Sequence, residues 1–183
     1  MTYLSDASCA TLIIVDLQEK LMPVILDGAQ VLQRAMILAQ AARLLGIPVI
    51  GTAQQPLRLG PTVAPIHALL DRTIEKSSFD ACAQAEFMES LIDSDESGRN
   101  DLIVLGCEAH VCVLQTALGL LYRHRRVTLV SDAIGSRRSG DKIAAIDRAR
   151  SAGAEIVSSE MLMFEWMGDS DHPKFREVLK LIK

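Results

Sequence analysis

The chain has 183 residues and a formal net charge of −4 at pH 7; hydrophobic residues make up 49% of it and aromatic residues only 4%. One domain with an aliphatic core suits this length and composition, so we expect a single domain over residues 1–183. The acidic balance argues against nucleic-acid binding, and no apolar run is long enough to span a membrane.

The first half of the chain predicts buried strands that alternate with helices. The run from Cys9 to Asp16 is continuous, apolar and rich in β-branched residues, which is typical of a strand buried on both faces of a parallel sheet. Residues 29–45 have helical spacing and are followed by Gly46, a residue that favours a helix end. The further elements expected are a strand over 48–52, a loop over 53–64, a strand over 72–76 and a helix over 83–92.

The second half repeats this alternation. Residues 111–123 are apolar on both sides of a helical pattern, which predicts a central helix. The other elements expected are a polar connection over 93–100, strands over 101–106, 127–131 and 154–157, a helix over 140–152, and two helices in 158–183 that divide near 168–173. This order predicts a three-layer α/β/α, Rossmann-like fold with a six-stranded, mainly parallel sheet and right-handed crossovers.

Three reactive side chains follow strand ends, which is where ligands bind in open α/β sheets. Asp16 ends the first strand, Lys76 ends the third, and G-C-E-A-H-V-C leads from the fourth into the helix with Cys112. We therefore expect the acid, the amine and the thiol to be neighbours. Ordinary roles stay open for each: a turn cap for Asp16, a solvated lysine for Lys76 and a small core residue for Cys112.

Cys112 falls in the first turn of its predicted helix, where unpaired N–H groups and the helix dipole favour an anion. Beside a cation its thiol pKa should be depressed, so we expect Cys112 to react first with iodoacetamide. His110 is a candidate base, but it lies two residues before Cys112, and this spacing points the two side chains in different directions. A pocket-lining or structural role therefore suits His110 better.

The four cysteines, Cys9, Cys82, Cys107 and Cys112, are irregularly spaced, and residues 1–6 lack the features of a secretory signal. We therefore expect a cytoplasmic protein with free thiols. The C-x4-C spacing is not typical of zinc, so we expect no metal site. The mean hydropathy of +0.22 is high for a monomer and favours a homo-oligomer.

Three motifs resemble those of the isochorismatase-like cysteine hydrolases, a superfamily that includes nicotinamidases and N-carbamoylsarcosine amidase. They are I-V-D-L-Q, which contains Asp16 and Gln18; E-K-S-S-F, which contains Lys76; and G-C-E-A-H-V-C-V-L-Q-T-A, which contains Cys112. Their order and spacing are similar to the superfamily's over nearly the whole chain. T-A-Q, L-G-P-T and S-S-E-M-L-M-F resemble most closely the isochorismatase domain-containing proteins, a subgroup largely without assigned substrates.

The resemblance implies the isochorismatase-like hydrolase fold and a cofactor-free catalytic triad of Asp16, Lys76 and Cys112. The implied reaction is hydrolysis of a small amide, carbamoyl or related C–N bond through a thioester on Cys112, with Asp16 as the base and Lys76 keeping that carboxylate ionised. A cis peptide bond between Cys107 and Glu108 is also implied. The backbone N–H groups of Glu108 and Cys112 would then form an oxyanion hole.

The resemblance also implies a pocket for a small-molecule substrate, lined by Gln18, Gln54, Phe79, Cys107 and His110. Nicotinamidases carry an Asp-x-His metal motif after the second strand, where this chain has G-T-A-Q-Q-P. That departure argues against a metal and against nicotinamide as the substrate. The turn D-A-I-G-S-R, which ends at Arg137, suits a structural role.

Two other functions stay open at this point. Isochorismatases proper hydrolyse a vinyl ether without a cysteine nucleophile, so an intact Cys112 disfavours that reaction. A non-catalytic scaffold that retains the site is the second alternative, and the presence of all three triad residues speaks against it. Isochorismate turnover that survives Cys112→Ala would favour the first alternative, and a lack of any amide hydrolysis would favour the second.

Overall fold

The computed structural model describes residues 4–96 and 98–183, with the side chains of 92–96 excepted. Six strands form one sheet in the order β3-β2-β1-β4-β5-β6, and every neighbouring pair is parallel. The strands are β1 (Ala10–Val15), β2 (Val49–Gln54), β3 (Arg72–Lys76), β4 (Asp101–Cys107), β5 (Arg126–Gly135) and β6 (Glu155–Val157). The predicted six-stranded sheet is confirmed, and it is wholly parallel.

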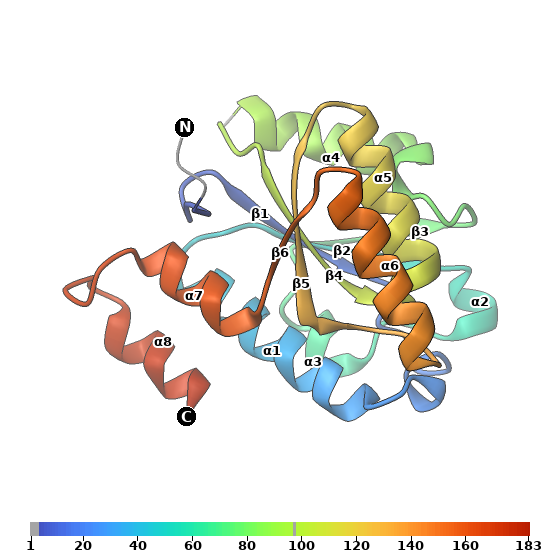
Figure 1. Cartoon of the computed structure of the whole chain (residues 1–183), viewed down its shortest axis with the longest axis horizontal. Helices are drawn as coiled ribbons and strands as arrows, with labels where there is room; N and C mark the ends of the chain where they lie inside the picture. Colours follow the sequence, from blue (N-terminus) through green and yellow to red (C-terminus); the bar gives the residue numbers. More distant parts are fainter. Residues whose placement is uncertain (1–3, 97) are drawn as a thin grey trace.

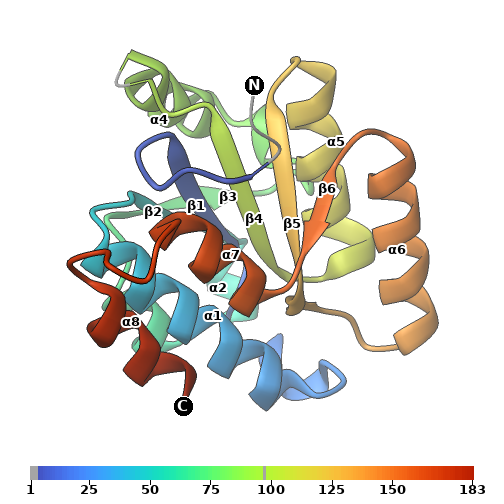
Figure 2. The same cartoon turned by 60° about the vertical axis from the view of Figure 1, so that its left-hand side comes forward.

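Helices cover both faces of the sheet, which gives the expected three layers (Figures 1 and 2). On one face α1 packs against α7 and α8, and on the other α5 packs against α6. The helices and helical turns are η1 (Met22–Val24), α1 (Gly28–Leu44), α2 (Pro56–Leu59), α3 (Ala64–His67), η2 (Ala81–Ala83), α4 (Ala85–Glu96), η3 (Ala109–Val113), α5 (Leu114–Tyr122), α6 (Ser139–Ser151), α7 (Ser159–Met167) and α8 (Phe175–Ile182). In the described part of the chain, none of them is both long and apolar enough to cross a membrane.

The two central strands, β1 and β4, approach each other closely at their carboxyl ends. Every residue of both strands is buried, as a sheet covered on both faces requires. Val15 pairs with Gly106, which has φ +119°, and a Cβ at Gly106 would lie 2.0 Å from the Val15 carbonyl oxygen. Only glycine fits there. Asp16, which follows β1, and Cys107, the last residue of β4, therefore lie side by side.

The sheet order also places a switch point between these two strands. The chain continues from β1 to β2 and β3 on one side, and from β4 to β5 and β6 on the other. Crossovers that diverge in this way leave a crevice at the carboxyl ends of the strands where they part. The candidate site residues lie at this end of the sheet.

The structure corrects four of the expected boundaries. The loop over 53–64 contains the short helix α2, which begins at Pro56, a residue whose fixed φ suits the first turn. The connection over 93–100 is helical to Glu96, because polar residues alone do not stop a helix; Ser97 lies outside the described residues. Strand β5 continues past Ser131 to Gly135, and the helix expected from Val111 starts earlier, as the π-helical turn η3.

The composition predicts free thiols and a homo-oligomer, and the structure bears directly on the first of these. All four cysteines are free, as expected. Leu57 and Tyr122 expose 99% and 84% of their surface, but single exposed side chains are common in monomers and do not test the oligomer. The homo-oligomer and the cytoplasmic location stay predictions.

Candidate active site

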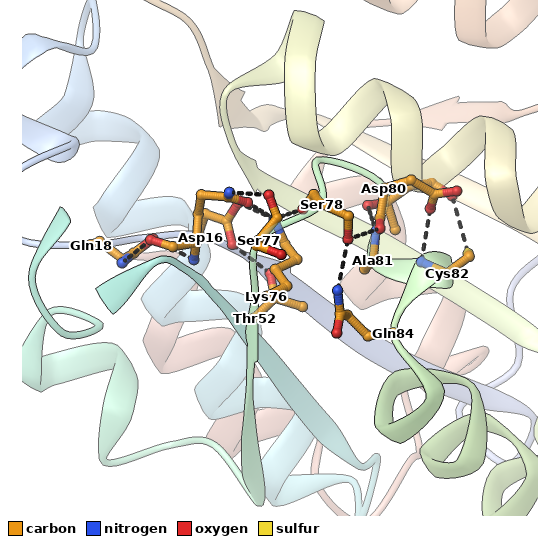
Figure 3. Close-up of polar contacts among 12 residues, drawn as sticks. Asp16, Gln18, Thr52, Lys76, Ser77, Ser78, Asp80, Ala81, Cys82 and Gln84 are labelled. Carbon is orange, nitrogen blue, oxygen red and sulfur yellow. Dashed lines mark hydrogen bonds and ion pairs between the residues drawn. The ribbon is translucent and has the colours of Figure 1, made fainter. Parts of the chain in front are cut away.

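The Asp16 carboxylate and the Lys76 ammonium form a buried ion pair (Figure 3). Lys76 Nζ lies 2.7 Å from Asp16 Oδ2, and neither side chain is accessible to solvent. Lys76 Nζ also donates to Gln54 Oε1 at 2.8 Å and to the Ser78 carbonyl at 3.3 Å. Thr52 Oγ1 donates to Asp16 Oδ1 at 2.7 Å. Burying two charges is costly, and these hydrogen bonds offset much of that cost.

Strand geometry brings the two charged groups together. Lys76 is the last residue of β3, and it shares the buried face of that strand with Ile74, two residues earlier. Asp16 follows β1 with φ +50°, a left-handed conformation that Asp tolerates better than most residues. Its backbone N–H still donates to the Thr52 carbonyl at 3.1 Å, which anchors the turn to β2.

Cys112 completes the group from the turn η3, which leads from β4 into α5. Its thiol lies near enough to the Asp16 carboxylate and the Lys76 ammonium for both charges to shift its pKa, in opposite directions. The peptide bond between Cys107 and Glu108, at the start of this turn, is cis. The structure thus brings together the three residues expected to be neighbours.

The pKa of the Cys112 thiol is raised to about 12, first by burial and then by the negative charge of Asp16, although Lys76 lowers it. The prediction of a depressed pKa is therefore wrong. It considered the helix start and the lysine, but the thiol is only 6% exposed, and desolvation of a thiolate outweighs both. In the resting protein the thiol of Cys112 is protonated at neutral pH.

Alkylation of Cys112 by iodoacetamide should therefore be slow at pH 7 and should accelerate about tenfold per pH unit, because the thiolate fraction rises in that proportion below the pKa. Cys9, which is partly exposed, should be labelled first, the reverse of the order expected from sequence. Asp16→Asn should speed the labelling of Cys112, since it removes the charge that raises the thiol pKa and keeps Lys76. Peptide mapping after timed labelling at pH 7, 8 and 9 measures the pH dependence, the order of labelling and the effect of Asp16→Asn. Labelling of Cys112 before Cys9 at pH 7 would contradict the raised pKa of the Cys112 thiol.

Two of the five expected pocket residues use their side-chain amides on protein partners. The Gln18 amide donates to the carbonyls of Gln54 and Gly60 and accepts from the Gln54 N–H. The Gln54 amide accepts from Lys76 and donates to the Ser77 carbonyl. Both side chains therefore join the strand ends around the ion pair, and a contact with substrate stays a prediction for each.

The other three expected pocket residues lie in different surroundings. Cys107 is fully inaccessible, and burial raises the pKa of its thiol to about 12. His110 Nδ1 is hydrogen-bonded at 3.0 Å to Ser136 Oγ in the β5–α6 connection, and its Nε2 lies 3.9 Å from Asp141 Oδ2 in α6. Phe79 is half exposed, in the loop after Lys76. Their contacts with substrate also stay predictions.

Sequence reasoning missed two contacts that hold the site. Thr52 donates a hydrogen bond to Asp16, and the sequence signal was its place at the end of the strand predicted over 48–52; it is the last residue of β2 that pairs with β1. The Glu108 carboxylate accepts from Arg137 Nε at 2.9 Å, a partner that the structural role expected for the turn with Arg137 did not specify. An acidic residue in an apolar strand-to-helix turn was the signal for a cationic partner.

An open hollow of about 440 Å³ lies beside the main chain of Lys76, whose side chain is inaccessible; neither Asp16, Cys112 nor any of the five expected pocket residues lines it. It is lined by Gln55, Pro56, Leu57, Arg58, Glu75, Lys76, Ser77 and Gln84. This volume suits a small molecule. Within the described residues, no three or more His, Cys, Asp or Glu side chains are grouped so that they could hold a metal ion.

Comparisons with known proteins place the chain among relatives that share this fold. The Isochorismatase domain family matches residues 10–161. The mouse isochorismatase domain-containing protein 2A is 37% identical over 175 residues, which span 94% of this chain and 82% of that protein; the human isochorismatase domain-containing protein 2 is 36% identical over 174 residues, 95% and 83% respectively. The solved structure of MAR1 ribonuclease from Caenorhabditis elegans superimposes with a TM-score of 0.91 at 37% identity, covering 98% of this chain and 92% of that one.

Proposed function

Because the chain belongs to the isochorismatase family of hydrolases, we propose that it is a cysteine-dependent hydrolase of a small amide, carbamoyl or related C–N bond. The observation that carries the proposal is the buried group of Asp16, Lys76 and Cys112. Buried charges beside a thiol contribute little to stability and are typical of functional sites. A thiol beside a carboxylate that can accept its proton has the arrangement of a nucleophile with its base.

In the proposed first half-reaction, the Asp16 carboxylate accepts the thiol proton of Cys112 as the sulfur attacks the substrate carbonyl carbon. Proton transfer must accompany the attack, because the raised pKa keeps the resting thiol protonated. The tetrahedral intermediate then collapses, its C–N bond breaks, and Asp16 returns the proton to the leaving nitrogen. Ammonia or an amine leaves, and the acyl group stays on Cys112 as a thioester.

In the second half-reaction, Asp16 accepts a proton from water while the water oxygen attacks the thioester carbonyl carbon. Collapse breaks the C–S bond and returns the proton to the sulfur of Cys112. The product is a carboxylic acid, or a carbamic acid when the substrate is a carbamoyl compound. The backbone N–H groups of Glu108 and Cys112 are the proposed donors to the oxyanion in both halves.

The proposal predicts that a true substrate leaves an acyl group on Cys112. A panel of small amides, carbamates and ureas is incubated with the enzyme, and released ammonia or amine is measured. Reactions with the compounds that are hydrolysed are then quenched in acid, in which a thioester survives. Peptide mass spectrometry should find the added acyl mass on the peptide that contains Cys112. Turnover of a panel member that Cys112→Ala leaves unchanged would contradict the proposal.

Hydrolysis of RNA is a second candidate, favoured by the relative named a ribonuclease at 37% identity. Phosphodiester cleavage does not need an acyl thioester, and an RNA backbone attracts positive surface, whereas this chain has a net charge of −4. We therefore prefer C–N hydrolysis and include RNA in the same panel. RNA cleavage that survives Cys112→Ala would favour the second candidate.

A further inference from the structure

The turn that carries the nucleophile is held from outside the triad by the connection between β5 and α6. Glu108 Oε2 accepts from Arg137 Nε at 2.9 Å and from the Arg137 backbone N–H at 3.3 Å. His110 Nδ1 and Ser136 Oγ are hydrogen-bonded at 3.0 Å. Arg137 and Ser136, which are consecutive in the β5–α6 connection, therefore bind Glu108 and His110, the residues on either side of Ala109.

These contacts extend the pairing of β4 with β5 past its last backbone pair. Gly106 pairs with Ile134 and Cys107 with Gly135, after a register shift within β5. Glu108 comes directly after the last paired residue of β4, and Ser136 directly after that of β5. Both turns leave the sheet at the same end, at the carboxyl ends of these strands (Figure 1).

Glu108 fixes the turn through its backbone as well as through its side chain. Its carbonyl oxygen accepts from the N–H groups of Val111 at 3.0 Å and Val113 at 3.2 Å, the two neighbours of Cys112. Its side chain is 11% exposed, whereas that of Arg137 is 59% exposed. A carboxylate buried to this extent depends on its charged partner. Without the Arg137 side chain, the Glu108 carboxylate would keep only the backbone N–H of residue 137 as a donor, at 3.3 Å, so the first residue of the turn around Cys112 would be held less firmly.

We propose that Arg137 is a positioning residue for the reaction: it clamps Glu108 so that the backbone N–H groups of Glu108 and Cys112 point at the developing oxyanion. This inference rests on the proposed function. Arg137 does not touch the reacting atoms. It acts through Glu108, and Ser136 supports the same turn through His110.

A misplaced oxyanion hole weakens binding of the transition state more than binding of the substrate. Arg137→Ala should therefore lower kcat by about 10- to 100-fold and leave KM within about threefold. Glu108→Gln keeps an oxygen that can accept from Arg137, so it should retain more activity than Glu108→Ala. Arg138→Ala is the matched control, because it removes the same charge from the next, exposed residue. Its kcat should stay near that of the wild type.

Hydrogen exchange of the intact protein separates this inference from the proposed function. Arg137→Ala should speed amide exchange over residues 107–113, and Arg138→Ala should not, whether or not a substrate is known. Faster exchange together with the loss in kcat supports the clamp. Unchanged exchange overturns it, and so does an unchanged kcat in an Arg137→Ala variant of an enzyme that hydrolyses amides. A wild type that hydrolyses no amide contradicts the proposed function, while exchange still reports on the clamp.

Discussion

Asp16→Asn, Cys112→Ala and the double variant should each lose about 10⁴-fold or more in kcat, and all three should fall to the same low level. The reason is that the thiol of Cys112 is protonated at neutral pH and lies beside the carboxylate that would accept its proton. Without Asp16 the proton has no acceptor, and without Cys112 the acceptor has no nucleophile to activate. Residues that act as one unit therefore give losses that do not add.

The chain contains a second aspartate–cysteine pair that serves as the matched control (Figure 3). Asp80 Oδ1 accepts from the Cys82 N–H at 2.8 Å, and burial followed by the Asp80 charge raises the pKa of the Cys82 thiol to about 12. This pair resembles that of Asp16 and Cys112 but lies outside the proposed triad. Asp80→Asn and Cys82→Ala should keep kcat within about threefold of the wild type. An equal loss in Cys82→Ala would mean that turnover is sensitive to any buried thiol rather than to a nucleophile.

The sequence predicted correctly those site residues whose position is set by the end of a strand. Parallel strands bring their carboxyl ends to one edge, so a residue that ends a buried run must lie there. Asp16 and Lys76 follow that rule, and Cys112 follows β4 by one turn. Their proximity was predictable without side-chain coordinates, because backbone topology alone brings them together.

The parts that sequence did not predict depend on side-chain burial and on strand register. The direction of the Cys112 pKa shift depends on how completely the thiol is desolvated, which one sequence does not give. The contact of Arg137 with Glu108 follows from a register shift inside β5, and the pattern of apolar residues does not reveal that shift. The π-helical start of the nucleophile's helix was missed for a related reason: residues apolar on both sides fit several helical periods equally well.

Lys76→Met should lower the free energy of unfolding by about 3–5 kcal/mol, the scale reported for removing one member of a buried ion pair. The Asp16 carboxylate would stay fully inaccessible with Thr52 Oγ1 as its remaining side-chain donor. Gln54 Oε1 would also lose the ammonium group that it accepts from. Urea denaturation measures the loss, and the melting temperature should fall by roughly 10 °C for a chain of this length.

An exposed ion pair provides the control for the same substitution. Lys174 Nζ lies 2.9 Å from Glu177 Oε1, and the two side chains are 43% and 47% exposed. Lys174→Met should therefore change the free energy of unfolding by no more than about 0.5 kcal/mol. The contrast between the two Lys→Met variants isolates burial of the partner carboxylate from any general effect of losing a lysine.

The double variant Asp16→Asn with Lys76→Met should recover most of the stability that Lys76→Met loses, because no uncompensated charge is then left in the core. It should remain inactive. Stability restored without turnover would indicate that the ion pair is kept for catalysis and not for folding, since neutral side chains of similar size hold the strand ends together as well. If the double variant is no more stable than Lys76→Met, the loss comes from the alkyl chain of Lys76 and its bonds to Gln54 and Ser78 rather than from the buried charge of Asp16.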